Sequence, residues 1–254
     1  MIKRTWMVLV ALLLGVASAS AGDVKKNFDL DSSPRIIEVS SAIDVEVISS
    51  NRNMMEVVGS AKALKQFEYS LSKGKLVLKR KTKLFDNLVS GKIEIKLYIT
   101  GVKDIVSIEA SGASAVELES NVPLALRTLD ISGASKISIE GQVRIFGADV
   151  SGASKLDFEG SAQEMILDLS GASRAEVDVL SVNELSVDVS GASGMELTGK
   201  VRRLVADVSG ASRLDAQEAV IEAASLEASG ASRITAKPIK VEHSSATGGS
   251  SIRQ

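Results

Sequence analysis

A four-residue motif, Ser-Gly-Ala-Ser, recurs through the second half of this 254-residue chain at a nearly constant spacing. The seven copies begin at Ser111, Ser132, Ser151, Ser170, Ser190, Ser209 and Ser229. A degenerate eighth copy, Thr247-Gly248-Gly249-Ser250, follows them, and successive starts are 18 to 21 residues apart. A unit repeated at such a period indicates a solenoid or another stacked architecture, whatever the local propensities are.

The residues on either side of each motif alternate between apolar and polar, as in Leu167-Asp168-Leu169 before one copy. A period of two is typical of β-strands with one buried face. When the copies are aligned, apolar columns lie three residues and one residue before the motif, and five residues after its first Ser. One unit cannot bury such a face alone, but stacked units can. The sequence therefore predicts an all-β fold: a parallel β-helix of about eight coils of 19–20 residues.

The glycine of each motif is predicted to form a corner between two strands. Gly adopts a positive φ without the clash that a Cβ would cause. The flanking Ser hydroxyls can pair with backbone groups that a corner leaves free. The predicted structural corners are Gly112, Gly133, Gly152, Gly171, Gly191, Gly210 and Gly230. Gly141, Gly160 and Gly199, each nine residues after a motif start, are predicted to mark a second corner.

The chain begins like a secretory signal peptide. Lys3 and Arg4 form a positive segment, an apolar stretch from Trp6 to Val16 follows, and small residues then extend to Ala21. The apolar stretch is shorter than the roughly 20 residues that span a membrane. We therefore expect residues 1–21 to be a signal peptide that is removed, leaving no transmembrane segment in a protein exported to the periplasm or surface of a bacterium.

Three further segments are predicted after the signal peptide. Residues 22–34 are expected to be a flexible leader, residues 35–101 an irregular β-rich part, and residues 102–254 the regular β-helix. Ile37 to Val47 aligns without a gap with Ile108 to Leu118, so the irregular part has a related strand pattern. Within it, strands are predicted at Met54–Val58, Leu76–Lys79 and Ile93–Thr100, and a short helical or irregular insertion at Lys62–Phe67.

Charged side chains also form columns, which strand parity directs outward. Acids lie two residues before each motif: Glu109, Asp130, Asp149, Asp168, Asp188, Asp207 and Glu227. Basic residues lie four residues after the motif starts: Lys136, Lys155, Arg174, Arg213 and Arg233. A second acidic column lies six residues after the motif starts: Glu117, Asp157, Glu176, Glu196 and Asp215. We expect the cations to share a face with the first acids and to relieve their repulsion, which makes a solvated face. The alternative is a binding face for a charged polymer or a cation.

Composition excludes several kinds of site. The chain has no Cys and one His, which excludes disulfides, thiolate metal sites and His-rich metal centres. A formal net charge of −2 gives no reason to expect nucleic-acid binding. Residues 73–96 hold eight basic residues against two acidic ones; a solvated face is the simpler interpretation, and a site for an anionic surface is the alternative. We expect no metal and no cofactor.

The regular columns of charged residues disfavour an enzymatic function. Polysaccharide-cleaving β-helix enzymes use clustered carboxylates and basic residues, but sugar sites generally also need aromatic platforms. Residues 102–254 contain only Phe146 and Phe158 as aromatic residues. The carboxylates are regularly repeated, whereas a catalytic pair needs one special environment that separates two pKa values. We therefore predict no enzymatic activity and no catalytic residues.

Several of these features together resemble one family. They are the export signal, the early strand Ile37-Glu38-Val39-Ser40, the lead-in Tyr98-Ile99-Thr100, the serial Ser-Gly-Ala-Ser coils and the closing stretch Gly248 to Ile252. The chain is similar over roughly residues 35 to 252 to the putative auto-transporter adhesin, head GIN domain family of bacterial envelope proteins. The resemblance implies a right-handed β-helix-like fold in two parts and brings no catalytic residues with it.

Three hypotheses of function follow. The first is a non-enzymatic envelope protein that presents a rigid, repetitive surface for adhesion to a protein or polymer. The second is a carbohydrate-active β-helix enzyme that acts on acidic polysaccharide. The third is an envelope scaffold that associates end to end with itself, because an open β-helix end offers unpaired strand edges. Loss of one carboxylate would abolish an enzyme but only weaken a repeated binding surface, which distinguishes the first two.

Overall fold

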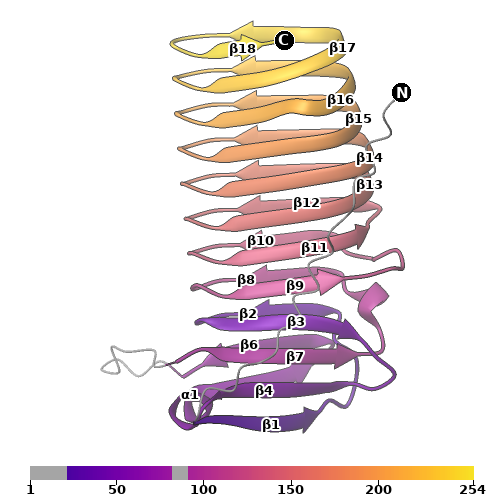
Figure 1. The fold of residues 1–254 in the computed structure, drawn as a ribbon, viewed down its shortest axis with the longest axis vertical. Coiled ribbons are helices and arrows are strands. Elements are labelled where there is room, and N and C mark those ends of the chain that lie inside the picture. The colour runs from indigo at the N-terminus through magenta and orange to yellow at the C-terminus, as the bar shows by residue number, and fades with distance from the viewer. Residues whose placement is uncertain (1–21, 82–90) are drawn as a thin grey trace, which may run out of the picture.

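Coils of β-strand are stacked into a rod in the computed structural model, which describes residues 22–81 and 91–254 (Figure 1). The predicted signal peptide, residues 1–21, lies outside the described residues. Parallel strands pair coil on coil along two sides of the rod. Stack 1 contains β2 (Ile36–Val39), β6 (Lys75–Arg80), β8 (Ser107–Ala110), β10 (Thr128–Ile131) and β12 (Ile145–Val150). Stack 2 contains β3 (Ile43–Ser49), β7 (Ile93–Ile99), β9 (Ala115–Glu119) and β11 (Lys136–Gln142).

Five long strands complete both stacks. Each runs along stack 2, passes a bend and continues into stack 1, and most of the register shifts between them fall at these bends. They are β13 (Lys155–Leu169), β14 (Arg174–Val189), β15 (Gly194–Val208), β16 (Arg213–Ala228) and β17 (Arg233–Ala246). The result is the predicted all-β stack, with about seven turns rather than eight. The eighth coil is incomplete because only β18 (Ser251–Arg253) follows the degenerate motif.

The core fills the space between the two stacks. All three apolar columns predicted from the repeat are buried, including Leu167, Leu169 and Ala175 around one corner. Phe146 and Phe158 stack on each other inside this core, with ring centroids 5.4 Å apart and an interplanar angle of 25°. These two rings are therefore part of the packing and are not exposed platforms for a sugar.

The irregular N-terminal part continues the same rod. β2 and β3 pair directly with β8 and β9, so the stacks are continuous across the boundary predicted near residue 101. The strands predicted in this part are confirmed as β4 (Met54–Ser60), β6 and β7, and the short insertion is confirmed as α1 (Ala61–Gln66). The Ser60 side chain caps α1 by accepting a hydrogen bond from the Ala63 N–H at 3.2 Å. A 3-10 turn at Val102–Asp104 connects β7 to β8.

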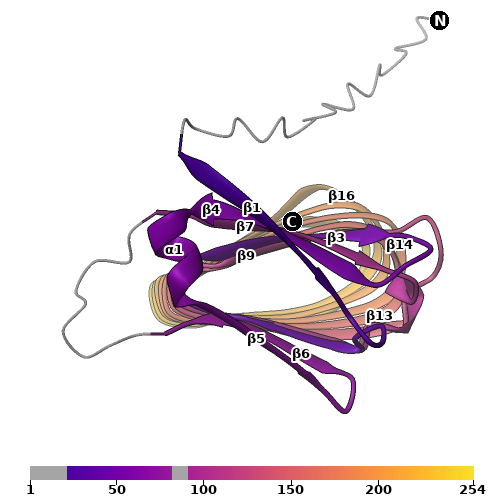
Figure 2. The ribbon, with the colours of Figure 1, turned by 90° about the horizontal axis from the view of Figure 1, so that it is seen from below.

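Antiparallel strands cover the N-terminal end of the rod (Figure 2). β1 (Asp23–Asp29) pairs with β4, β4 pairs with β7, and β5 (Phe67–Ser72) pairs with β6. The prediction of a flexible leader over residues 22–34 is therefore wrong for β1. β4 leaves one edge free, and β1 satisfies its backbone groups. β1 is an exposed edge strand with few apolar residues, so it lacks the alternation by which the other strands were predicted.

Candidate functional site

The Ser-Gly-Ala-Ser corners hold the two stacks together. The seven motif glycines have φ values between 63° and 75°, and Gly141, Gly160 and Gly199 at the second corner also have positive φ. At Gly171 a Cβ would lie 2.7 Å from the Gly152 carbonyl oxygen, so successive corners stack with no room for a side chain. The last Ser of each motif is buried, and backbone N–H groups of Ser114, Ser135 and Ser193 donate to the Ser hydroxyl of the next coil. The corners therefore fix the spacing of everything that lies on the faces.

A continuous ladder of acids follows the outer face of stack 1. Its members are paired in register from coil to coil: Glu38, Glu109, Asp130, Asp149, Asp168, Asp188, Asp207 and Glu227. We call these eight residues the acid ladder. All but Glu38 were named from the sequence. Glu38 could have been found, because the early strand aligns with the coil that contains Glu109.

The middle of the acid ladder has no cationic partner in the part of the chain that the structure describes. Within residues 22–81 and 91–254, ion pairs reach the ladder only near its ends, where Lys75 contacts Glu38 and Glu109 and His243 lies 3.6 Å from Glu227. The five aspartates between them form no ion pair with any described basic residue. Burial, together with repulsion from Asp149 and Asp188, raises the pKa of Asp168. These carboxylates therefore carry electrostatic repulsion that a cationic ligand would relieve.

The predicted cation column does not relieve the repulsion within the acid ladder. The prediction that these cations share a face with the acids of the ladder is therefore wrong. The chain turns at the corner between the two columns, so the cations lie on stack 2 while the acid ladder lies on stack 1. They pair with the second acidic column instead: Lys136 and Lys155 contact Asp157 at 2.7 and 3.0 Å, and Lys155 contacts Glu176 at 2.9 Å. Arg213 likewise pairs with Asp215. Arg174 and Arg233 have no ion pair among the described residues.

Stack 2 is consequently a face of mixed charge. A shallow groove of about 350 Å³ on this stack is lined by acids of the second column, such as Glu117 and Asp157, and by further acids, such as Glu140 and Glu159. In this groove burial, together with repulsion from Glu119 and Glu159, raises the pKa of Glu140. No group of three or more His, Cys, Asp or Glu residues in the described part of the chain is arranged to hold a metal ion. No helix in that part is long and apolar enough to cross a membrane.

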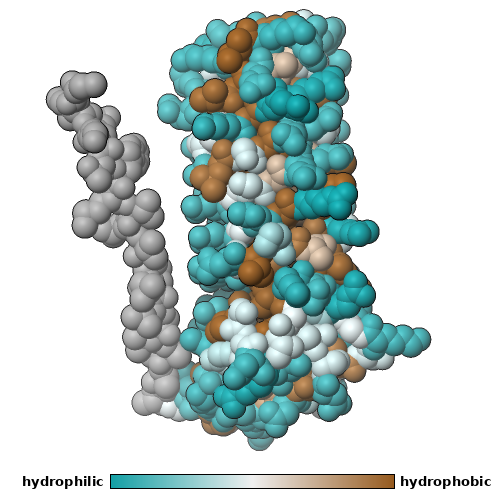
Figure 3. All heavy atoms as spheres, turned by 90° about the vertical axis from the view of Figure 1, so that its right-hand side faces the viewer, coloured by the Kyte–Doolittle hydropathy of each residue, from teal (hydrophilic) through white to brown (hydrophobic). Residues whose placement is uncertain are grey.

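Hydrophobic side chains are exposed on the side of the rod that carries the bends (Figure 3). Leu180 and Val220 lie at register shifts of β14 and β16, and they are 73% and 58% exposed. A shift adds residues to one strand that the next strand does not match, so these side chains cannot turn into the core. Their exposure therefore follows from the bends.

The chain matches the family described as "Putative auto-transporter adhesin, head GIN domain" over residues 33–193 and again over residues 167–254. A search of curated proteins finds no match.

Several solved structures share the fold. A putative adhesin from Parabacteroides merdae is 14% identical with a TM-score of 0.65, covering 92% of this chain and 97% of its own. A putative adhesin from Parabacteroides distasonis is also 14% identical, with a TM-score of 0.66 and coverage of 91% and 97%. A structure described as a putative lipid binding protein from the same species has 14% identity, a TM-score of 0.66 and coverage of 92% and 97%.

Proposed function

Because the chain belongs to the putative auto-transporter adhesin, head GIN domain family, we propose that it is an exported envelope protein that adheres to a cationic protein or polymer through its acid ladder. The family and the β-solenoid fold support an adhesion-like, non-enzymatic role. The signal-like segment at residues 1–21 supports export to the periplasm or the cell surface. The finer claim, that the acid ladder makes the contact, depends on its geometry.

One observation carries this proposal: five aspartates follow one another in register without a cationic partner among the described residues. Coils are separated by about 4.8 Å, so neighbouring carboxylates lie well within a Debye length of each other. A partner with several positive charges would relieve the repulsion between the carboxylates at each coil. Many weak contacts made at the same time would together give strong binding. The buried corners keep the row straight, so little ordering is needed on binding.

Binding to immobilised poly-lysine at graded salt concentrations tests the role of the acid ladder. The test variant replaces Asp130, Asp149, Asp168, Asp188 and Asp207 with Asn. The matched control makes the same change of charge on stack 2, by replacing Glu117, Glu119, Glu159, Asp178 and Glu196 with their amides. We expect at least a tenfold loss of affinity for the test variant and a much smaller loss for the control. Equal losses would show that only net charge matters and that the acid ladder is not the binding surface.

Two further measurements test the rest of the proposal. Protein recovered from the native envelope should begin after residue 21, and a mature protein that still begins at Met1 would exclude signal cleavage. Purified protein should show no turnover on a panel of acidic polysaccharides, because the acids are repeated and lack the one distinct environment that a catalytic pair needs. Turnover that a single substitution such as Asp168→Asn abolishes would establish the enzyme alternative instead.

A further inference from the structure

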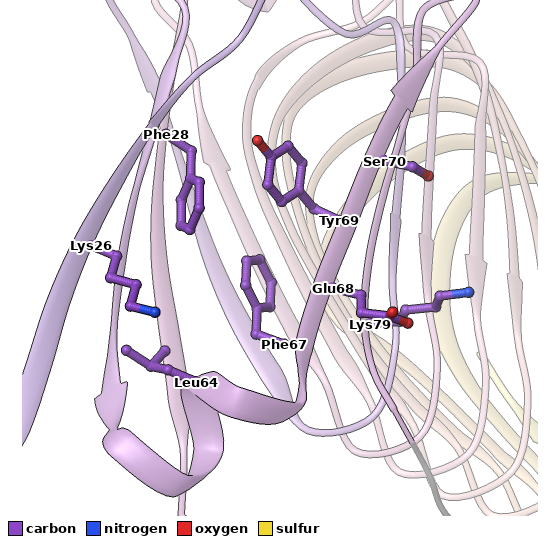
Figure 4. A pocket seen from close by; sticks show the side chains of 8 residues that line it. All are labelled: Lys26, Phe28, Leu64, Phe67, Glu68, Tyr69, Ser70 and Lys79. Atoms are coloured by element: carbon purple, nitrogen blue, oxygen red, sulfur yellow. The ribbon is translucent and has the colours of Figure 1, made fainter.

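A hollow lined by aromatic rings lies at the N-terminal end of the rod, outside the regular coils (Figure 4). It has a volume of about 540 Å³ and lies between β1, α1 and the hairpin of β5 and β6. Phe28 from β1 and Phe67 and Tyr69 from β5 pack against one another in its lining (Figure 4). This volume is in the range of sites for small ligands.

The three rings form one cluster. The Phe28 ring centroid lies 5.1 Å from that of Tyr69 and 6.2 Å from that of Phe67, and Phe67 and Tyr69 are stacked with an interplanar angle of 19°. Strand parity explains the stacking, because residues 67 and 69 of β5 project to the same side. Three of the aromatic residues of a chain that is only 3% aromatic therefore meet at one place.

The three rings differ in how much they are buried against the hydrophobic core. Phe28 and Phe67 are half-buried and pack against the hydrophobic core, so they close the end of the rod. Tyr69 contacts both of these rings but is itself 38% exposed. A ring that served only to close the core would turn its face inward, whereas Tyr69 leaves part of its surface open to a ligand.

The charge beside the rings is positive. Lys26 projects to the same side of β1 as Phe28, lines the hollow and has no carboxylate partner among the described residues. The register partners Glu68 and Lys79 project to the opposite side of the hairpin from the rings (Figure 4). Lys26 therefore offers an anion a cationic contact next to the rings.

We propose that this hollow binds an acidic saccharide. The C–H face of a pyranose ring is apolar and flat, which suits contact with an exposed aromatic face, and its carboxylate or sulfate group suits an unpaired lysine. The Lys26 ammonium and the Tyr69 hydroxyl lie on the ring side of the hollow, and these polar groups suit a sugar better than an acyl chain. The site is separate from the acid ladder, and the proposal does not rest on the function assigned to that ladder.

Binding can be measured through Tyr69 itself. The chain has one Trp and two Tyr, so full-length protein carrying Trp6→Phe and Tyr98→Phe retains Tyr69 as its only such fluorophore. Trigalacturonic acid is the probe, and its methyl ester is the uncharged counterpart. We expect a saturable change in Tyr69 emission with trigalacturonic acid and a much weaker response with the ester.

Substitutions locate the binding. In calorimetry with Tyr98 intact, Tyr69→Ala should weaken binding of trigalacturonic acid about tenfold, and Tyr69→Phe should restore most of the affinity. Lys26→Gln should weaken it about threefold. The matched control is Lys200→Gln, which removes one exposed lysine from β15 and should have no effect. Circular dichroism melts check that each variant is folded.

Several results would overturn the proposal. They are an absence of binding, equal binding of the methyl ester, and an equal loss in Lys200→Gln. Inorganic sulfate that competes as well as the sugar would show a simple anion site. Vesicles of phosphatidylglycerol that bind through Tyr69 while the sugar does not would show a membrane contact. The five-aspartate variant of the acid ladder should retain full sugar binding.

Discussion

Replacing Gly171 with Ala should destabilise the rod by an amount that the structure allows one to calculate. Gly171 has a φ of 74°, a region that costs an L-residue about 1–2 kcal/mol. Its new Cβ would lie 2.7 Å from the Gly152 carbonyl oxygen, which accepts a hydrogen bond from the Ala172 N–H at 2.7 Å. Moving this oxygen would weaken a hydrogen bond worth about 1 kcal/mol. The expected total is about 2–3 kcal/mol.

The assay is thermal unfolding followed by circular dichroism. For a domain of this size about 1 kcal/mol shifts the melting temperature by about 2–4 °C, so Gly171→Ala should lower it by about 4–12 °C. The matched control is Gly194→Ala, because Gly194 lacks a positive φ and its Cβ would meet no atom within 4 Å. There the substitution restricts the unfolded chain and should stabilise by about 0.4–1 kcal/mol. Shifts of the same sign and size in both variants would refute the argument that stacked corners require glycine.

Three other predictions concern the faces. Since the folded-state pKa of Asp168 is raised, ionisation of this carboxyl destabilises the fold. The melting temperature of the unmodified protein, relative to that of Asp168→Asn, should therefore rise as the pH falls through this pKa. A difference between the two proteins that does not change with pH would contradict this prediction. Lys155→Ala should cost up to about 1 kcal/mol in urea unfolding, because two ion pairs are lost, whereas Arg174→Ala should cost less; the reverse order would be inconsistent with the observed pairing. Calcium should bind the acid ladder only in the millimolar range, because two neighbouring carboxylates supply at most four of the six to eight oxygens that it prefers. A micromolar site in calorimetry, or a large fall in melting temperature with chelator, would show otherwise.

The fold was predictable because the repeat specifies the corner and the buried positions of every coil. Each motif copy places Gly at a corner and apolar residues at fixed offsets, so the inward columns, including Leu167 and Ala175, follow from period two and stacking alone. The register of the acids follows in the same way, because each coil aligns with the next. Seven aligned copies make a pattern that local propensity in any one copy cannot obscure.

The arrangement of the faces was harder to predict. Strand alternation separates inward from outward positions, but it does not state which of two stacks an outward residue lies on. Asp168 and Arg174 are only six residues apart, yet a corner lies between them and they belong to different stacks. The aromatic hollow was missed for another reason: Phe28, Phe67 and Tyr69 come from segments outside the repeat, and antiparallel pairing with no column in the sequence brings them together.

Because each coil of the repeat contacts mainly the coils on either side of it, the rod is also a molecular ruler. Duplication or loss of one unit would change its length by about 4.8 Å and leave every column aligned. The near-identical Ser-Gly-Ala-Ser stretches offer natural points for such exchanges by recombination between gene segments. The number of units therefore sets the distance between the aromatic end and the C-terminal end of the rod, and this distance changes in single steps without any change of side chain.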